Sequence, residues 1–408
     1  MKAGWQTKTL GDVCEFQRGL TYAKGDEVDV SDNIVLRAMN IDLATNLLDF
    51  SELKYISDEI AIPENKKVKA GSLMICTASG SKLHLGKVAY IDGDYGYAFG
   101  GFMGMVTPKH ELHPKFLFHL MTSPDYKDFI ATLSDGANIN NLKFDDLRKF
   151  VVPLPPLPEQ QRIVAILDEA FDGIAVARAN AEQNLQNARA LFESHLQSVF
   201  TQRGEGWEEK PFEELIESNV IGLTKNSREQ GEDKAYPYVK MNNITRDNRF
   251  DFSSFTCVDA TGEEVSKFSL RDGDFLFNTR NSYELVGKSC IYESDSDDLV
   301  LFNNNIMRVR FKGGVDARFV LLAFSSKAVA DELNSLKSGT TNVSAIYFKD
   351  LKSLPISIPP IEAQKAISAQ LKLLAIETQH LESLYQCKLA ALDELKKSLL
   401  HQAFSGML

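Results

Sequence analysis

The sequence predicts an α+β protein built from one unit of about two hundred residues that occurs twice, each unit being a mixed α/β domain followed by a long helix. Two observations predict this architecture. Two long segments carry apolar residues at alternating steps of three and four, and short segments of the first half recur in the same order in the second half. Because that spacing is typical of helices that bury a seam against another helix, we expect two long helices in an antiparallel coiled coil between two similar domains.

Residues 1–154 are expected to form the first domain. Short apolar runs bounded by glycine and polar residues predict strands at 35–41, 73–77, 88–91 and 105–107. The segments 114–121 and 124–133 are predicted to be helical. A polar loop over 134–141 and an extended segment then lead into the first long helix.

Residues 155–203 are expected to form the first long helix with a proline-rich hinge. The segment opens with prolines that favour an extended backbone, and Glu159 follows where the helix dipole favours an anion. About forty residues at 1.5 Å each predict a helix of roughly 60 Å. The apolar stripe consists of Ile163, Leu167, Ala170, Ile174, Ala177, Ala181, Leu185, Ala188, Phe192, His195 and Val199.

Residues 204–357 are expected to form the second domain because they repeat the first. The corresponding segments are Gly206-Trp207 and Gly4-Trp5, 238–244 and 35–41, 272–279 and 70–77, and 348–351 and 144–147. The two domains are therefore expected to share one fold and one arrangement of loops.

Residues 358–408 are expected to form the second long helix, which opens with Pro359-Pro360. If the helices run antiparallel, the two ends of the second domain meet at one place, as compact domains prefer. We therefore expect a rod with one domain at each end and a pseudo-twofold axis between them. The stripe of this helix includes three polar residues and consists of Ile367, Leu371, Leu374, Thr378, Leu381, Tyr385, Lys388, Leu392, Leu395, Leu399 and Gln402.

Composition and charge limit the possible functions. The net charge of −11 argues against a nucleic-acid partner unless a local basic face exists. No apolar run is long enough to span a bilayer, the N-terminus lacks a signal-peptide core, and five scattered cysteines form no C-x-x-C pair. A cytoplasmic protein without disulfides or zinc is expected.

The search for catalytic and metal-binding motifs returns none. Gly287-Lys288-Ser289 lacks the first glycine of a phosphate-binding loop and is better explained as a turn. No N-P-P-[FY] motif of an amino-methyltransferase and no H-E-x-x-H motif occur, and His110 and His113 fit a solvated loop better than a metal site. We therefore predict no catalytic residue, no metal and no cofactor in this chain.

Polar loops at matching positions of the two domains are the candidate binding surfaces, because Asn reads adenine edges, Arg and Lys read guanine and phosphate, and Ser and Thr serve either. Taken singly, each residue fits an ordinary surface loop; recurrence at equivalent positions favours DNA binding for the sets. The predicted DNA-binding residues are Arg37, Asn40, Ser79, Ser81, Lys82, Lys87, Asn138 and Asn140 in the first domain, and Lys240, Asn242, Asn243, Arg280, Asn281, Tyr283, Lys288, Thr340 and Asn342 in the second.

The chain resembles the specificity (S) subunits of Type I restriction–modification systems over essentially its whole length. The strongest mark is the run Pro153-Leu154-Pro155-Pro156-Leu157-Pro158-Glu159-Gln160-Gln161-Arg162-Ile163, which recurs in weaker form at 358–367. In that family, each such run closes a target-recognition domain and opens a helical spacer. The second copy departs slightly, with Glu362-Ala363-Gln364 in place of Glu-Gln.

The resemblance implies a non-catalytic subunit that binds a bipartite, asymmetric site in double-stranded DNA, one half per recognition domain. Two methyltransferase (M) subunits, which bind S-adenosylmethionine and methylate adenine, would dock along the helices, and restriction (R) subunits, which use ATP and Mg, would join the complex. The residues expected to contribute to partner binding are Gln160, Gln161, Ile163, Leu167, Ile367 and Leu371.

Two other functions remain open at the level of sequence. A non-catalytic coiled-coil scaffold or DNA mimic without sequence preference would explain the acidic charge. An independent nuclease or methyltransferase would require the cofactor or metal motifs that are missing.

Overall fold

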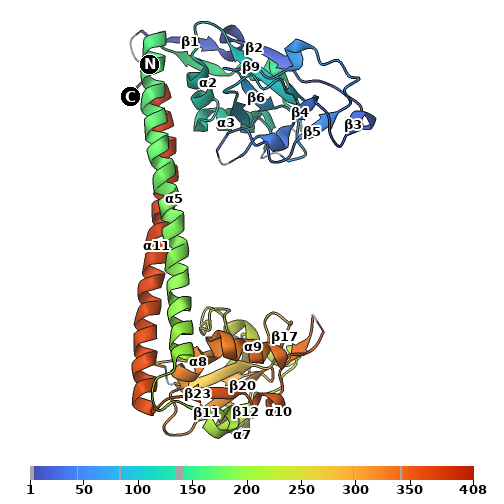
Figure 1. The fold of residues 1–408 in the computed structure, drawn as a ribbon. Coiled ribbons are helices and arrows are strands. Elements are labelled where there is room, and N and C mark those ends of the chain that lie inside the picture. The colour runs from blue at the N-terminus through green and yellow to red at the C-terminus, as the bar shows by residue number, and fades with distance from the viewer. Residues whose placement is uncertain (1–3, 44, 82–83, 135–140, 297, 341) are drawn as a thin grey trace. The chain divides into compact units, whose positions relative to one another are not determined.

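The computed structural model describes all residues except 1–3, 44, 82–83, 135–140, 297 and 341 (Figure 1). The chain forms two compact units. Unit 1 comprises Met1–Gln183 and Tyr385–Leu408, and unit 2 comprises Asn184–Leu384. Each unit therefore contains one mixed domain together with adjoining parts of both long helices.

The unit 1 domain is organised around a four-stranded antiparallel sheet in the order β2-β9-β6-β7. A second four-stranded sheet, in the order β3-β5-β4-β8, ends in a parallel pair, and β1 and β10 form a separate antiparallel ribbon. The strands are β1 (Gln6–Thr9), β2 (Cys14–Arg18), β3 (Glu27–Val28), β4 (Ile34–Leu36), β5 (Lys54–Ile56), β6 (Leu73–Cys76), β7 (Val88–Tyr90), β8 (Ala98–Phe99), β9 (Met103–Pro108) and β10 (Val151–Leu154).

The central strand β6 shows why this domain has two apolar layers. All four of its residues are buried. Because side chains alternate along a strand, Leu73 and Ile75 face one core, while Met74 and Cys76 face another. The first core is shared with α2 (Pro114–Leu120) and α3 (Pro124–Ser134), and with the long helices. Short helices α1 (Leu10–Val13) and α4 (Phe144–Leu147) and the 3₁₀ turns η1 (Lys24–Asp26), η2 (Ala38–Asn40) and η3 (Glu64–Lys66) complete the domain.

The unit 2 domain repeats this topology. Its main sheet has the order β12-β20-β16-β18, its second sheet the order β13-β15-β14-β19, and β11 pairs with β23. The strands are β11 (Glu208–Pro211), β12 (Ile216–Ile221), β13 (Gln230–Gly231), β14 (Tyr236–Val239), β15 (Thr256–Val258), β16 (Asp274–Asn278), β18 (Ser289–Tyr292), β19 (Leu301–Phe302), β20 (Ile306–Phe311) and β23 (Pro355–Ile358).

The helices of unit 2 follow the same order, with one replacement. They are α6 (Phe212–Leu215), η5 (Ser227–Glu229), η6 (Met241–Asn243), α7 (Gly262–Phe268), α8 (Ala317–Ser325), α9 (Lys327–Ser335) and α10 (Phe348–Leu351). Helix α7 replaces the single turn η3 of unit 1, and Thr261 caps it by accepting a hydrogen bond from the Glu264 backbone N–H. The predicted repeat is confirmed. The predicted strand at 35–41 is shorter, because residues 38–40 form a 3₁₀ turn.

The two long helices are α5 (Leu157–Gln202) and α11 (Ile361–Ser405), and they are in contact. In unit 1, Arg162 donates a hydrogen bond of 2.8 Å to the Leu408 carbonyl, and Arg178 pairs with Asp393. In unit 2, Arg189 pairs with Glu382 at 3.1 Å. In each unit, later residues of α5 therefore meet earlier residues of α11, so the helices are antiparallel there.

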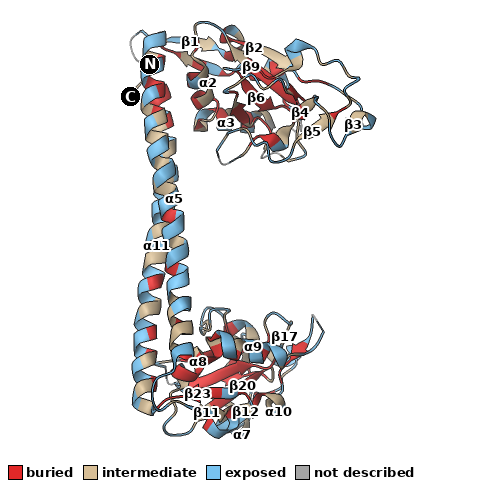
Figure 2. Cartoon of the chain, in the orientation of Figure 1, coloured by how far each residue is buried: buried red, intermediate tan, exposed pale blue. Residues whose placement is uncertain are grey.

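Burial along the helices tests the predicted stripes (Figure 2). Every stripe residue predicted for α5 is buried or half-buried. In α11 the expectation was wrong at Lys388 and Leu395, which are exposed, whereas the neighbouring Leu389 and Lys396 are half-buried. A straight α-helix drifts relative to a strict 3.5-residue repeat, so the contact line moves by one residue over several turns.

The last turns of the two helices pack in equivalent ways. In unit 2, the Phe200 ring of α5 lies 5.3 Å from that of Phe319 in α8. In unit 1, the Phe404 ring of α11 lies 5.2 Å from that of Phe116 in α2. The end of each long helix thus completes a domain core.

Candidate nucleic-acid interface

A small ribbon at the end of the main sheet brings together four of the nine predicted residues of unit 2: Arg280, Asn281, Thr340 and Asn342. It is a three-stranded sheet in the order β17-β22-β21, formed by β17 (Arg280–Asn281), β22 (Ser344–Ala345) and β21 (Ser338–Gly339). Gly339 has a φ of +122°, and a Cβ there would lie 2.4 Å from the Val343 carbonyl oxygen, so the turn between β21 and β22 requires glycine. Thr340 and Asn342 are exposed at this turn.

Basic and aromatic side chains meet on and beside this ribbon, and we call them the basic–aromatic patch: Arg280, Tyr283, Lys337, Tyr347 and Lys349. The Arg280 guanidinium lies 5.9 Å from the centre of the Tyr347 ring, and Lys349 Nζ lies 5.7 Å from the same ring. Lys337 Nζ lies 4.8 Å from the Tyr283 ring and donates to the Tyr283 carbonyl. Basic side chains can bind DNA phosphates, and exposed tyrosine rings can stack on bases, so this combination is typical of a nucleic-acid-binding surface.

A buried asparagine supports this patch from below. Asn278, at the end of β16, donates hydrogen bonds of 3.0 Å to the carbonyls of Arg280 and Asn305. Its side-chain oxygen accepts a bond of 2.9 Å from Asn281 Nδ2. Asn281 Oδ1 in turn accepts from the Ser282 N–H, so Asn281 is tied into the loop while Arg280 points away from it.

The same position in unit 1 carries different side chains. Ala78 forms an isolated antiparallel bridge with Asn141, where unit 2 has the β17–β22 pair. A cavity of about 120 Å³ opens beside it, lined in part by Arg18, Phe102 and Phe144. Phe102 is 73% exposed, and the Arg18 guanidinium lies 5.6 Å from the Phe144 ring. Ser79 and Ser81 are half-buried in the adjacent loop, where Ser79 Oγ accepts a bond from the Ser81 N–H.

Two of the predicted asparagines are buried and hydrogen-bond the backbone instead of facing solvent. Asn40 and Asn243 are almost completely buried. Asn40 donates to the carbonyls of Asp49 and Glu52 and accepts from the Arg37 N–H. Asn243 repeats this pattern in unit 2, with Lys240 N–H as the donor to its oxygen. The expectation that these side chains face DNA is corrected, because their polar atoms already bond the backbone of their own loops.

Two predicted lysines are engaged in the same loops. Lys87 Nζ donates to the Ile41 carbonyl at 2.9 Å, and Lys288 Nζ donates to the carbonyls of Met241 and Ile244. Burial lowers the pKa of both ammonium groups. These half-buried lysines connect the main sheet to η2 and η6, and their expected contact with DNA stays a prediction.

The remaining predicted residues are distributed as follows. Arg37 is half-buried and pairs with Glu27 at 2.8 Å, and Lys240 Nζ donates to Thr256 Oγ1 at 3.3 Å. Asn242 is exposed. Lys82, Asn138 and Asn140 lie outside the described residues.

The residues predicted for partner binding lie at the helix starts. Ile163, Leu167 and Leu371 are buried in the cores of their own units, and Ile367 packs against one of them. Gln160 is fully buried as well, whereas Gln161 is exposed. Only Gln161 of this set keeps an exposed side chain, so the other residues stabilise the domain–helix junction instead of offering a surface to a partner.

Within the described residues, no cluster of three His, Cys, Asp or Glu side chains could hold a metal ion. No helix among the described residues is both long and apolar enough to cross a membrane.

Sequence reasoning missed Lys337, Tyr347 and Lys349 in unit 2, and Arg18 and Phe102 in unit 1. Lys349 lies in a segment that does recur between the repeats, but no motif distinguishes these residues from other surface positions. Their proximity to the predicted loops depends on strand pairing that joins segments more than sixty residues apart, such as Arg280↔Ala345.

Comparison with known proteins now identifies the family. A model described as the Type I restriction modification DNA specificity domain matches residues 2–186 and again residues 204–385. The Type I restriction enzyme EcoKI specificity subunit of Escherichia coli (strain K12) is 26% identical, over 99% of this chain and 89% of that protein. The StySPI specificity subunit of Salmonella potsdam is 25% identical over the same shares.

Solved structures show the same fold. A chain from a study of complex assembly and conformational transition of the Type I R-M system aligns with a TM-score of 0.74 and 19% identity, covering 99% of this chain and 98% of that chain. The HsdS subunit from Thermoanaerobacter tengcongensis aligns with a TM-score of 0.66 and 21% identity, over 100% and 98% of the two chains. Since both repeats match the family model, the protein belongs to the Type I restriction–modification DNA specificity family, whose members are the non-catalytic specificity subunits of these systems.

Proposed function

We propose that this DNA specificity subunit reads a bipartite, asymmetric target, with one half-site for each unit. The observation that carries this proposal is that the two domains share one topology but present different side chains at the same place. Arg280, Asn281 and Tyr347 stand in unit 2 where Ala78, Ser79 and Lys143 stand in unit 1. Because base edges are recognised by side-chain donors and acceptors, different side chains on one scaffold imply different half-sites.

The chemistry of the basic–aromatic patch suggests how unit 2 reads its half-site. An arginine can donate two hydrogen bonds to O6 and N7 of guanine in the major groove. Arg280 is exposed and lies over the Tyr347 ring, which restricts its orientation. Lys337 and Lys349 fit phosphate contacts, which position the protein without reading sequence. In unit 1, Arg18 and the exposed Phe102 line the small cavity beside Ala78 and offer a cation and an aromatic ring there.

The long helices are proposed to form an antiparallel coiled coil that sets the separation of the two half-sites. Two methyltransferase subunits would dock along it and supply S-adenosylmethionine chemistry, and restriction subunits would supply ATP- and Mg-dependent steps. Exposed leucine and isoleucine side chains on α11, at Leu373, Ile376 and Leu384, are suitable for such docking. Partner subunits would also complement the net charge of −11 at the DNA channel. The assembly would work in the cytoplasm.

The test is a map of methylated adenines in the source cell with and without this gene. Loss of one split, asymmetric motif on deletion is the expected result. An unchanged map in a cell that expresses active methyltransferase subunits would favour the alternative function, a scaffold or DNA mimic without sequence preference. Domain exchange then refines the result: replacing residues 204–357 by the matching domain of a relative should change one half of the motif only.

A further inference from the structure

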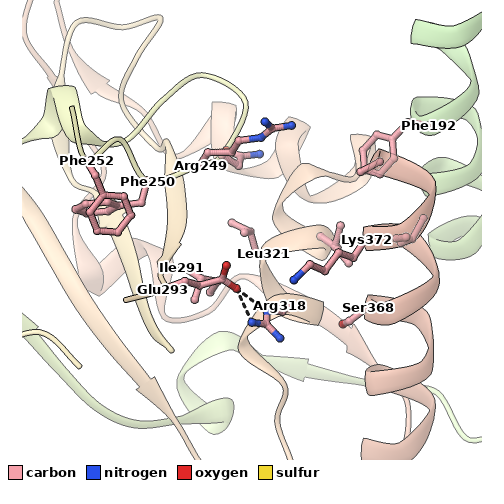
Figure 3. Close-up of a pocket in the computed structure, with 14 residues that line it drawn as sticks. Phe192, Arg249, Phe250, Phe252, Ile291, Glu293, Arg318, Leu321, Ser368 and Lys372 are labelled. Carbon is pink, nitrogen blue, oxygen red and sulfur yellow. Dashed lines mark hydrogen bonds and ion pairs between the residues drawn. The ribbon is translucent and has the colours of Figure 1, made fainter. Parts of the chain in front are cut away.

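Unit 2 contains a cavity of about 400 Å³ between its domain and the adjoining parts of the long helices (Figure 3). Phe250 and Phe252 line one side, and Leu321 of α8 lies opposite, beside Ser368 and Lys372 of α11. The Lys372 side chain extends from α11 towards Arg318, which pairs with Glu293 at 2.6 Å. The volume is at the lower end of the range of about 300–1,000 Å³ typical of binding pockets.

The equivalent position in unit 1 is filled by the chain itself. The equivalence follows from the shared hydrogen bonds of Gln160 and Gln364. Gln160 accepts from the His113 N–H and Gln364 from the Asp316 N–H. Counting from these residues, Asp168 corresponds to Lys372 on the long helices, and Lys115 corresponds to Arg318 on the domain helices. Asp168 accepts bonds of 2.6 Å from Lys115 and 2.8 Å from His119 Nε2. The Phe171 ring lies 5.4 Å from the His119 ring, and Lys396 Nζ lies 5.1 Å from the centre of the Phe171 ring.

Two substitutions between the repeats account for the cavity. Phe171 corresponds to Ala375, which removes an aromatic ring, and Asp168 corresponds to Lys372, which reverses the charge. Smaller side chains also line the unit 2 side, since Leu321 and Ile291 stand where Phe118 and Tyr90 pack 5.9 Å apart in unit 1. The result is an open pocket at a place where the other repeat has a closed core.

The charges of this pocket are unbalanced. Arg249, Arg318 and Lys372 line it, and Glu293 is the acidic residue among the lining side chains. Glu293 pairs with Arg318, and Arg249 pairs with Asp247 outside the pocket. Among the residues that the structure describes, Lys372 has no ion-pair partner. In unit 1, by contrast, the Asp168 carboxylate compensates Lys115, and this hydrogen bond raises the pKa of the lysine.

One exposed apolar side chain of α11 stands next to the pocket lining. Ile376 is 54% exposed and lies one helical turn after Lys372, on the same side of α11. A cationic, aromatic-lined pocket next to such a residue suits a helix that brings both a carboxylate and an apolar face.

We propose that this pocket binds a helix of a partner protein that carries an acidic and an aromatic side chain three residues apart. The carboxylate takes the place that Asp168 holds in unit 1 and pairs with Lys372 and Arg318, and the aromatic ring takes the place of Phe171 over Leu322 and Ala375. The apolar flank of the partner helix covers Ile376. Unit 2 therefore docks this partner, whereas unit 1, whose equivalent site is already filled, does not.

The test uses the purified full-length chain and a fluorescent alanine-based helical peptide of about 20 residues, a length at which isolated helices form. The probe peptide carries Asp and Phe three residues apart, and its control carries Asn and Ala at those positions. We expect saturable binding of the probe and no saturable binding of the control. The double variant Lys372→Asp with Ala375→Phe recreates the filling of unit 1 and should weaken probe binding by about tenfold or more.

Further variants keep the test decisive. Lys372→Gln removes the charge without filling the pocket and should also weaken binding, which covers the case in which the double variant misfolds. Lys327→Asp makes the same charge reversal on α9, at an exposed residue outside the pocket, and should leave binding unchanged. Equal binding of the probe and control peptides, or unchanged binding by both pocket variants, would overturn the proposal.

Competition with 3-phenylpropanoate separates a protein partner from a small acid. We expect this acid to displace the probe only at far higher concentration, because it lacks the helix that covers Ile376. Displacement at concentrations equal to those of the probe would reassign the pocket to a free aromatic acid. No DNA is present, so the outcome is independent of half-site reading.

Discussion

Gln364 of α11 makes the same three hydrogen bonds as Gln160 of α5, 204 residues earlier. The Gln160 oxygen accepts a bond of 2.7 Å from the His113 N–H, and its amide nitrogen donates to the carbonyls of Glu111 and Pro155. Gln364 accepts from the Asp316 N–H at 2.8 Å and donates to the carbonyls of Gly314 and Pro359. Each glutamine therefore connects the start of a long helix to the loop before α2 or α8 and to the proline hinge.

The variant Gln160→Ala is expected to destabilise unit 1 by about 2–3 kcal/mol, because it leaves a buried N–H and two carbonyls without partners. Chemical denaturation measures the change, followed by tryptophan fluorescence in a Trp207→Phe background so that Trp5 of unit 1 is the reporter. The exposed neighbour provides a matched control: Gln161→Ala should change stability by less than about 0.5 kcal/mol. Equal effects of the two substitutions would refute the structural role of Gln160.

Removing the Arg280 side chain should relax reading of one half-site and leave the other intact. Arg280→Ala loses the exposed guanidinium over Tyr347, and loss of a bidentate base contact costs about 1–3 kcal/mol of discrimination. Sequencing of DNA bound by the assembled methyltransferase measures preference at every target position. Arg271→Ala, an exposed arginine away from the patch, is the control. Equal weakening of both half-sites by Arg280→Ala would show that Arg280 positions DNA without reading it.

Two glycines are required because the backbone of another strand approaches them closely. A Cβ on Gly19 would lie 1.9 Å from the Gly100 carbonyl oxygen, and a Cβ on Gly222 would lie 2.3 Å from the Phe302 and Asn303 carbonyl oxygens. We expect Gly19→Ala to destabilise unit 1, and Gly222→Ala unit 2, by roughly 3 kcal/mol or more, since backbone cannot move aside cheaply. Thermal unfolding measures both. Gly25→Ala, which meets nothing within 4 Å, should be tolerated, and a comparable loss there would contradict this explanation.

Stability of unit 1 should fall as the pH decreases below about 6.5, the ordinary pKa of histidine. Burial lowers the pKa of His119, so the folded state keeps the imidazole neutral while the unfolded chain takes up a proton. Burial favours a protonated Asp168, yet hydrogen bonds from Lys115 and His119 hold its pKa below the usual value. Stability from Asp168 is therefore fully present above about pH 3.8 and does not change in this window.

The variant His119→Leu, which introduces the residue found at the equivalent position of unit 2, should reduce this pH dependence. The measurement is the midpoint of thermal unfolding between pH 7.5 and 5.5. His401→Leu, at an exposed position on α11, serves as the control. If the unfolding midpoint of His119→Leu falls with decreasing pH as steeply as that of the parent protein, the pH dependence belongs to other groups. One such group is His113, because burial also lowers the pKa of its imidazole.

The spacer between half-sites should follow the length of the two long helices. Inserting four residues into both helices, next to the Arg189–Glu382 pair, adds about 6 Å at 1.5 Å per residue, which corresponds to one or two base pairs. An insertion beside Glu159 alone would instead disturb the Gln160 hydrogen bonds. The methylated motif of the variant gives the spacer directly, and a spacer of unchanged length would exclude the helices as its determinant.

The sequence by itself determined the repeat, the strands of the main sheets and the two long helices. These features depend on local patterns: apolar runs, glycine turns, proline hinges and stripes at helical spacing. Gln160 is also visible in the sequence, where a partner-binding role is expected for it, because an amide that bonds three buried backbone groups looks the same in a sequence as one that contacts a partner.

The tertiary structure alone decided which polar residues face outward. Asn40 and Asn242 both lie in polar loops after a strand, yet Asn40 is buried against its own backbone and Asn242 is exposed. It also decided that Lys372 and Ala375 leave a pocket where Asp168 and Phe171 fill one. The physical reason is that burial and hydrogen bonding depend on which segments pack together, and segments far apart in the sequence supply those partners.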